Sequence, residues 1–185
     1  MLIDTHTHLL MRELGEDPAG AAARARDAGV NGMISIGIDR ANSEATVELA
    51  KRLDGVWAAV GVHPNETSGA SEADWEAIRA LVAEPEVVAV GESGMDLYWD
   101  RSSPEVQRSW LERHAELALE HDLPLVLHVR DAFDPVREVL PPFAARGLRG
   151  VMHCFGGGPD DLEPFVGWGF LISFAGNLTY KSGEP

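Results

Sequence analysis

Short apolar runs alternate with longer stretches of helical periodicity along this chain, and the alternation constrains the fold more than any other feature. Val60, Val62, Val88, Val126 and Val129 lie in nearly continuous hydrophobic runs, which are typical of strands covered on both faces. Strands that alternate with helices at this spacing form βαβ units and a parallel sheet. We expect strands near residues 2–7, 33–38, 57–62, 87–92, 125–129, 150–154 and 170–174.

The stretches between these runs carry the signals of helices. Ser71 is a predicted N-cap, and Trp75, Ile78 and Val82 form an apolar stripe behind it. Pro104 is typical of a first helical turn and begins the longest of these stretches. We expect helices near residues 18–28, 42–53, 72–82, 104–121, 135–145 and 160–167, and therefore an α/β fold.

Length and composition fit one globular unit. A chain of 185 residues that is 45% hydrophobic suits a single domain, and no compositional shift marks a boundary within residues 1–185. No apolar stretch approaches the roughly 20 residues that span a bilayer, and the first residues lack the pattern of a signal peptide. Cys154 is the single cysteine, so no internal disulfide can form. We expect a cytoplasmic protein that does not bind membranes.

The charge balance bears on the partners of the chain. A formal net charge of −15 repels polyanions over most of the surface and argues against a protein that coats duplex DNA. Bound divalent cations invert the local field, so nucleic acid can still be a substrate at a metal site. Any binding of phosphate is therefore expected to be local.

Residues of the kinds that bind metals follow the predicted strands. His6 and His8 are two apart on an extended segment and project to the same side, so both rings can meet one ion. Glu92, His128 and His153 each end a further apolar run. A barrel of parallel strands gathers its catalytic side chains at these strand ends. The pattern predicts a metal site built from all five residues.

Each of these residues has a structural alternative when it is considered alone. A single buried histidine is more often a hydrogen-bonded core residue, and a single glutamate after a strand is more often on the surface. Four histidines and a glutamate at the ends of four predicted strands reverse these odds. A carboxylate shared between two ions, with two histidines on each, can polarise a phosphoryl oxygen and ionise a water.

The chain carries five short motifs, which are Asp4–Leu9, Gly61–Pro64, Gly91–Asp96, His128–Arg130 and His153–Phe155. In order and spacing they resemble the motifs of the TatD-type metal-dependent deoxyribonucleases. The resemblance runs from Leu2 to Lys181 and implies a TIM-type (β/α) barrel of the amidohydrolase superfamily.

The resemblance also implies roles for these residues. His6 and His8 bind one divalent ion, His128 and His153 bind the other, and Glu92 bridges them as the catalytic carboxylate. The ions are Mg²⁺ or Mn²⁺, and a histidine-rich site also accepts Zn²⁺. DNA is the implied substrate.

Three further residues are predicted to contact the substrate by the same resemblance. His63 positions phosphate or a leaving oxygen, Arg130 grips phosphate, and Asp96 orients a histidine or a water beside the site. The structural alternatives are a loop histidine fixed by Pro64, and an ion pair between Arg130 and Asp96 at the rim.

The end of the sequence departs from the family pattern. The family carries an eighth strand ending in Glu-Thr-Asp, whose aspartate completes the first metal site, and nothing of that kind follows Lys181. We expect about seven of the eight strands, with the last strand and helix missing, and weaker metal binding at His6 and His8. The alternatives to a DNase are a hydrolase of a small amide, ester or lactone, and a catalytically impaired metal-binding fragment.

Overall fold

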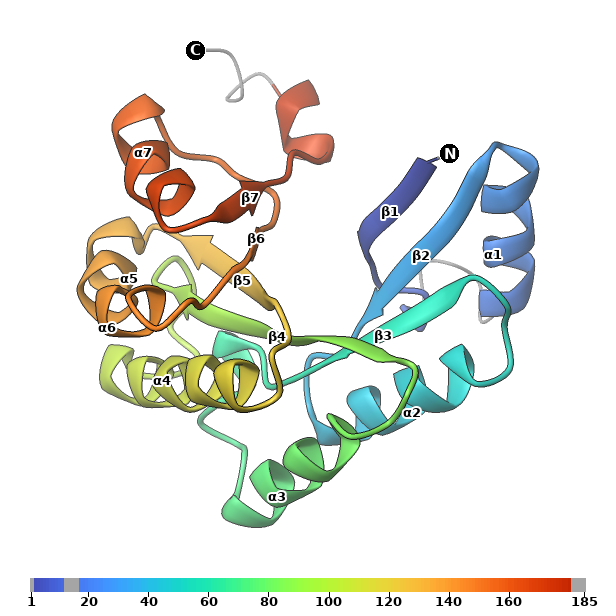
Figure 1. The fold of residues 1–185 in the computed structure, drawn as a ribbon, viewed down its shortest axis with the longest axis horizontal. Coiled ribbons are helices and arrows are strands. Elements are labelled where there is room, and N and C mark those ends of the chain that lie inside the picture. The colour runs from blue at the N-terminus through green and yellow to red at the C-terminus, as the bar shows by residue number, and fades with distance from the viewer. Residues whose placement is uncertain (1, 12–16, 181–185) are drawn as a thin grey trace.

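The computed structural model of the chain describes residues 2–11 and 17–180, and it has the α/β architecture that the alternating pattern predicts. Parallel strands form a curled, open half-barrel with the helices on its outside (Figure 1). The strands are β1 (Leu2–Thr7), β2 (Val30–Ile36), β3 (Val56–Val60), β4 (Val87–Asp96), β5 (Leu125–Arg130), β6 (Gly150–Met152) and β7 (Phe170–Ile172).

The helices follow the predicted ranges closely, with one exception. We predicted one helix over residues 135–145, but two helices occupy this stretch and meet at Leu140. Pro141 and Pro142 lack the N–H groups that would continue the first helix, so a new one begins there. The helices are α1 (Pro18–Asp27), α2 (Arg40–Ala50), α3 (Glu72–Leu81), α4 (Pro104–Glu120), α5 (Phe133–Val139), α6 (Pro141–Ala144) and α7 (Pro159–Gly167), with 3-10 turns η2 (Pro64–Glu66) and η3 (Gly176–Thr179).

The strands of the described residues lie side by side in chain order, from β1 to β7, and every neighbouring pair is parallel. This order is that of a (β/α) barrel, in which each helix returns the chain to the next strand position. In the part of the chain that the structure describes, β1 and β7 are the two edges of the sheet. An opening separates them (Figure 1). Lys181, the last residue of the resemblance, lies outside the described residues.

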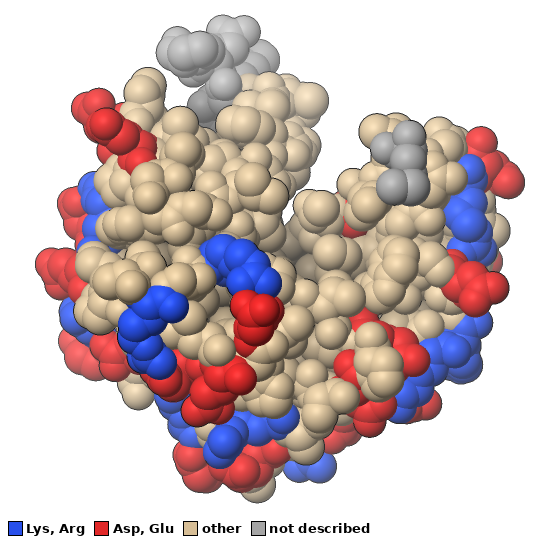
Figure 2. Space-filling model, in the orientation of Figure 1, with Lys and Arg blue, Asp and Glu red and all other residues tan. Residues whose placement is uncertain are grey.

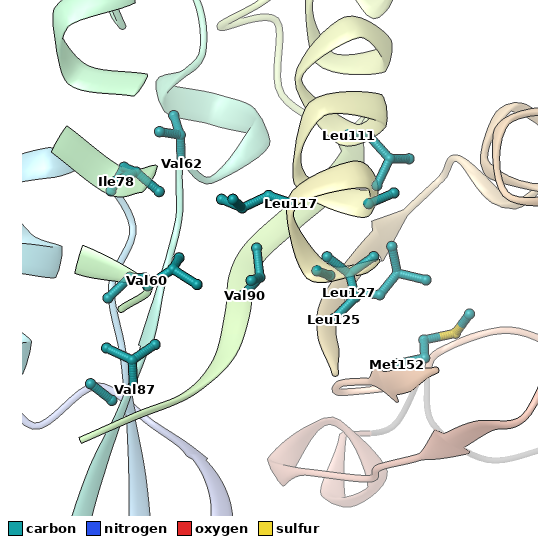
Figure 3. Close-up of a cluster of buried hydrophobic side chains, with 14 of the residues drawn as sticks. Val60, Val62, Ile78, Val87, Val90, Leu111, Leu117, Leu125, Leu127 and Met152 are labelled. Atoms are coloured by element: carbon teal, nitrogen blue, oxygen red, sulfur yellow. The ribbon is translucent and has the colours of Figure 1, made fainter. Parts of the chain in front are cut away.

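The outer face of the sheet packs against the helices. Figure 3 shows Val60, Val90 and Leu125 from successive strands facing Leu111 and Leu117 of α4, and all five side chains are buried. They belong to one large apolar cluster that also includes the predicted stripe of α3. The helix-facing side of the sheet is therefore the main core of the molecule.

The inner face of the sheet holds a smaller apolar cluster of Ile36, Ala59, Ala89 and Val126. Successive strand residues point to opposite faces, so His128, two residues after Val126, points into the same interior. The inner apolar residues thus line the interior first, and the polar side chains that follow them lie nearer the C-terminal ends of the strands.

Local signals place the elements as predicted. Ser71 caps α3 with a reciprocal capping box that involves Asp74. Ser103 caps α4, and Pro104 occupies its first turn. Among the helices that the structure describes, none combines the length and apolar character needed to cross a membrane.

Candidate metal centre

Strand β4 places Glu92 at the middle of the interior. We predicted that Glu92 ends its strand, but β4 continues to Asp96, and the pairing with β5 shifts register between Val90 and Ser93. Gly94 has φ +151°, and a Cβ there would lie 1.9 Å from the carbonyl oxygen of His128. Only glycine allows β4 and β5 to approach so closely at this point. Glu92, two residues earlier on the same strand, is buried, with 2% of its surface exposed.

One carboxylate oxygen of Glu92 faces the histidines of β1. Its Oε2 lies 3.4 Å from His6 Nε2 and 3.6 Å from His8 Nε2. The two Nε2 atoms are 3.2 Å apart, which confirms that the His-x-His pair projects to one side. These three atoms form the first triangle.

The other oxygen of Glu92 faces the histidines of β5 and β6. Its Oε1 lies 2.8 Å from His128 Nδ1 and 2.6 Å from His153 Nε2. The two ring nitrogens are 3.1 Å apart. These atoms form the second triangle, which is more compact than the first.

The donor atoms in each triangle fit a metal ion. Nitrogen and oxygen ligands about 2.1 Å from an ion lie roughly 3 Å from one another, which is the spacing seen here. His6 and His153 also form a group with Glu92 whose ligand atoms all lie within 4.8 Å of one another, as do His63 and His128 with Glu92. The structure thus brings together all five predicted ligands, and it adds His63 to the same cluster.

Burial and hydrogen bonds set the charge of the cluster. Burial opposes ionisation of Glu92, but hydrogen bonds from His128, His153 and His6 outweigh it and hold the pKa well below its usual value. Burial lowers the pKa of His8 and of His153, despite the attraction of Glu92. An ionised Glu92 beside the neutral imidazoles of His8 and His153 is the protonation state in which these groups bind metals.

Asp96 lies behind His128. Its Oδ2 is 3.1 Å from His128 Nε2 and accepts a hydrogen bond from Asn65 Nδ2 at 3.1 Å. Burial opposes ionisation of Asp96, yet the hydrogen bond from His128 lowers its pKa to about 2. Burial would likewise lower the pKa of His128, but hydrogen bonds to Asp96 and Glu92 raise it to about 9.

The position of Asp96 bears on its predicted contact with substrate. Asp96 is only 1% exposed, so its carboxylate holds a histidine rather than facing solvent. Asn65 holds the same carboxylate, and sequence reasoning missed it because a lone asparagine after a His-Pro pair carries no distinctive pattern.

His63 lies beyond β3 at the start of η2. Its Nδ1 accepts a hydrogen bond from the backbone N–H of Asn65 at 3.1 Å, and its Nε2 lies 3.6 Å from Glu92 Oε1. Burial lowers the pKa of His63 to about 4. A neutral ring whose Nδ1 accepts a hydrogen bond must carry its own proton on Nε2. His63 therefore presents an N–H to the cluster.

Arg130 lies at the mouth of the cluster. It lines a cavity of about 400 Å³ together with His128, His153, Asn177 and Tyr180. No ion pair joins Arg130 to Asp96 within residues 2–11 and 17–180; the guanidinium instead covers the ring of Tyr98, with Cζ 3.8 Å from the ring centroid. Figure 2 shows that the molecule is hollowed between two arms, one of which ends in β1 and the other in β7. Charged residues gather over the outer surface (Figure 2).

These features define a class of protein. A parallel half-barrel that gathers histidines and a buried carboxylate in its interior is the scaffold of a metal-dependent hydrolase. Comparison with known families identifies the particular one. The family described as TatD related DNase matches residues 3–185, and the chain belongs to this family.

Individual relatives agree with this assignment. An uncharacterized metal-dependent hydrolase of Bacillus subtilis, YabD, is 33% identical over 184 residues, which are 100% of this chain and 72% of that protein. The 3′-5′ ssDNA/RNA exonuclease TatD of Escherichia coli is 33% identical over 175 residues, which are 95% of this chain and 67% of the exonuclease. The crystal structure of YJJV, a TatD homologue of Escherichia coli, has a TM-score of 0.90 at 31% identity over 97% of this chain and 70% of that one.

Proposed function

We propose that this chain is a phosphodiester hydrolase of the TatD type that acts on DNA at a centre of two divalent ions. The observation that supports it most directly is the division of Glu92 between two triangles, with Oε2 toward His6 and His8 and Oε1 toward His128 and His153. A carboxylate that presents one oxygen to each histidine pair is suited to bridge two ions.

The ligand set fits Mg²⁺, Mn²⁺ or Zn²⁺ as the resident ions. When bound, such ions polarise a phosphoryl oxygen and lower the pKa of a water. The family match and the named activity of the Escherichia coli relative support nucleic acid as the substrate class.

The hydrogen bonds of the other residues at the centre indicate what each of them would do. Asp96 accepts from His128 Nε2 and would keep the proton there when an ion displaces the proton that His128 Nδ1 shares with Glu92. His63 has its Nδ1 engaged by Asn65, so its Nε2–H is placed to donate to a phosphate or leaving oxygen rather than to bind metal. Arg130, in the wall of the cavity, provides a positive charge for phosphate.

The proposal is tested with Glu92→Ala and the control Glu76→Gln, an exposed carboxylate on α3. Cleavage of a labelled single-stranded oligonucleotide in Mn²⁺ should fall on the order of a hundredfold or more in Glu92→Ala and stay unchanged in the control. Equal cleavage by both variants would contradict the proposal. Hydrolysis of small esters or lactones without cleavage of any oligonucleotide would contradict the substrate class.

A further inference from the structure

Two large aromatic side chains face solvent beside the candidate metal centre. Tyr98 and Trp99 follow β4 directly and are 54% and 46% exposed. Their rings meet edge to face, with centroids 4.9 Å apart at 87°. Adjacent exposed aromatic residues are unusual on the surface of a soluble protein and typically mark a binding surface.

The backbone beneath these rings is fixed by buried hydrogen bonds. The N–H groups of Tyr98 and Trp99 both donate to Asp96 Oδ1, at 3.1 and 3.2 Å. The buried side chain of Gln107 accepts from the Asp96 N–H and donates to the carbonyl oxygens of Asp96 and Ser102. The rings are therefore exposed on a backbone that is already ordered, which lowers the entropic cost of binding a ligand.

A positive charge accompanies the rings. The Arg130 guanidinium lies over Tyr98 and is 5.8 Å from the centroid of Trp99, and Arg101 approaches Trp99 at the same distance. Within the described ranges, no carboxylate lies within ion-pair distance of Arg130, although the chain as a whole has a net charge of −15. This spot favours a ligand that is both flat and anionic.

The aromatic surface is tied to the metal centre through two residues. Arg130 contacts Tyr98 and also lines the cavity that reaches His128 and His153. Asp96 holds the two aromatic N–H groups with Oδ1 and faces His128 with Oδ2. A ligand on the rings is thereby held at a fixed position relative to the cluster.

We propose that Tyr98, Trp99 and Arg130 form an aromatic platform, in which an unpaired nucleobase of a single-stranded nucleic acid stacks on one ring and contacts the edge of the other. This inference rests on the proposed function. The platform takes the base next to the cleaved phosphodiester, and the guanidinium balances the charge of the neighbouring phosphate. Paired bases in a duplex already stack on each other, so the platform selects single strands.

The platform is tested by equilibrium binding to the full chain loaded with Ca²⁺ in place of Mn²⁺. The probes are fluorescein-labelled oligothymidylate, oligouridylate and an abasic oligomer of the same length, which keeps the phosphates but lacks the bases. Tyr98→Ala and Trp99→Ala should each bind the base-bearing probes about ten-fold more weakly and bind the abasic oligomer as wild type does. Tyr98→Phe should bind all three as wild type does, because it keeps the ring.

Trp57→Ala, which removes an exposed aromatic residue on β3, serves as the control and should not change binding. Thermal unfolding of each variant shows whether it is folded. An equal loss of affinity for the abasic oligomer, or no loss for any probe, would overturn the platform. A larger loss for oligothymidylate than for oligouridylate, or the reverse, would also support it and show which of the two probes makes more use of the rings.

The outcome is separable from that of the proposed function. Cleavage that depends on Glu92, together with no effect of the aromatic variants, would contradict the platform alone. Discrimination between base-bearing and abasic probes by a chain that cleaves neither would support the platform and contradict the nuclease proposal.

Discussion

At the scale of single residues, the candidate centre depends on groups that orient the predicted ligands. Asp96 is the clearest case, because one oxygen faces His128 while the other accepts from the backbone of the loop. Replacement of the carboxylate by an amide at Asp96→Asn should weaken metal binding about ten- to a hundred-fold, since His128 loses its charged partner. Titration with Mn²⁺ followed by calorimetry measures the change.

Asp100, an exposed carboxylate directly after Trp99, provides a matched control as Asp100→Asn. Its metal affinity should equal that of wild type. If Asp96→Asn binds Mn²⁺ as tightly as this control, Asp96 does not orient a ligand.

A second residue-scale prediction concerns the contact between β4 and β5. A methyl group at Gly94 would meet the carbonyl of His128 at 1.9 Å on a backbone with φ +151°, so Gly94→Ala should destabilise the fold by about 3 kcal/mol or more. Gly167→Ala, where a Cβ meets nothing within 4 Å, should change stability by less than about 1 kcal/mol. Urea unfolding compares the two, and similar stabilities would refute the packing argument.

At the scale of elements, helix α4 is linked to the backbone before His63. His114 is fully buried, its Nε2 accepts from the Val62 N–H at 3.0 Å, and its Nδ1 donates to the Trp110 carbonyl. Burial lowers the pKa of His114 to about 4, and the nearby Arg113 acts in the same direction. The folded state thus requires the neutral ring.

This link predicts a pH dependence of stability. The unfolded chain binds a proton at His114 near pH 6.5, while the folded chain does so only near pH 4. The contribution of His114 to the free energy of unfolding is therefore complete above pH 6.5 and is lost as the pH falls from 6.5 to 4. The loss amounts to about 3 kcal/mol for this group. The free energy of unfolding of wild type should therefore fall by that amount relative to His114→Gln as the pH is lowered from 6.5 to 4. A gap between the two free energies of unfolding that stays constant over this pH range would contradict it.

Most of the elements could be predicted because their signals are local. Alternating apolar runs, the Ser71 cap and Pro104 are each read from adjacent residues, and the structure confirms them. The split at Leu140 was missed because apolar periodicity continues across Pro141 and Pro142. The extension of β4 to Asp96 was missed because two glycines within it resemble a turn.

The candidate centre could be predicted only as a list of residues. Strand-end histidines and Glu92 indicate metal chemistry from their types and order, but the division of the two Glu92 oxygens between two histidine pairs depends on how the sheet curls. The same holds for Asn65 and for the stacking of Arg130 on Tyr98, which bring residues from different strands and loops together.

At the scale of the whole molecule, the cluster joins the two arms of the half-barrel. The His6 ring on β1 stacks on the His153 ring after β6, with centroids 3.8 Å apart, although β1 and β6 do not pair. Bound ions would strengthen this link. Removal of both ions with EDTA should therefore cost about 5 kcal/mol, taking each ion at about a hundred times its Kd, and lower the Tm by roughly 10–20 °C. An unchanged Tm would show that the ions do not join the arms.

The central claim is that Glu92 is shared by two metal ions, and electron paramagnetic resonance of the Mn²⁺-loaded chain, with the metal content measured alongside, tests it most directly. Wild type should hold two ions per chain with the spectrum of an exchange-coupled pair, because one carboxylate bridges them. Glu92→Ala should lose the coupling and at least one ion. A single ion in wild type, or two ions without coupling, would contradict the account.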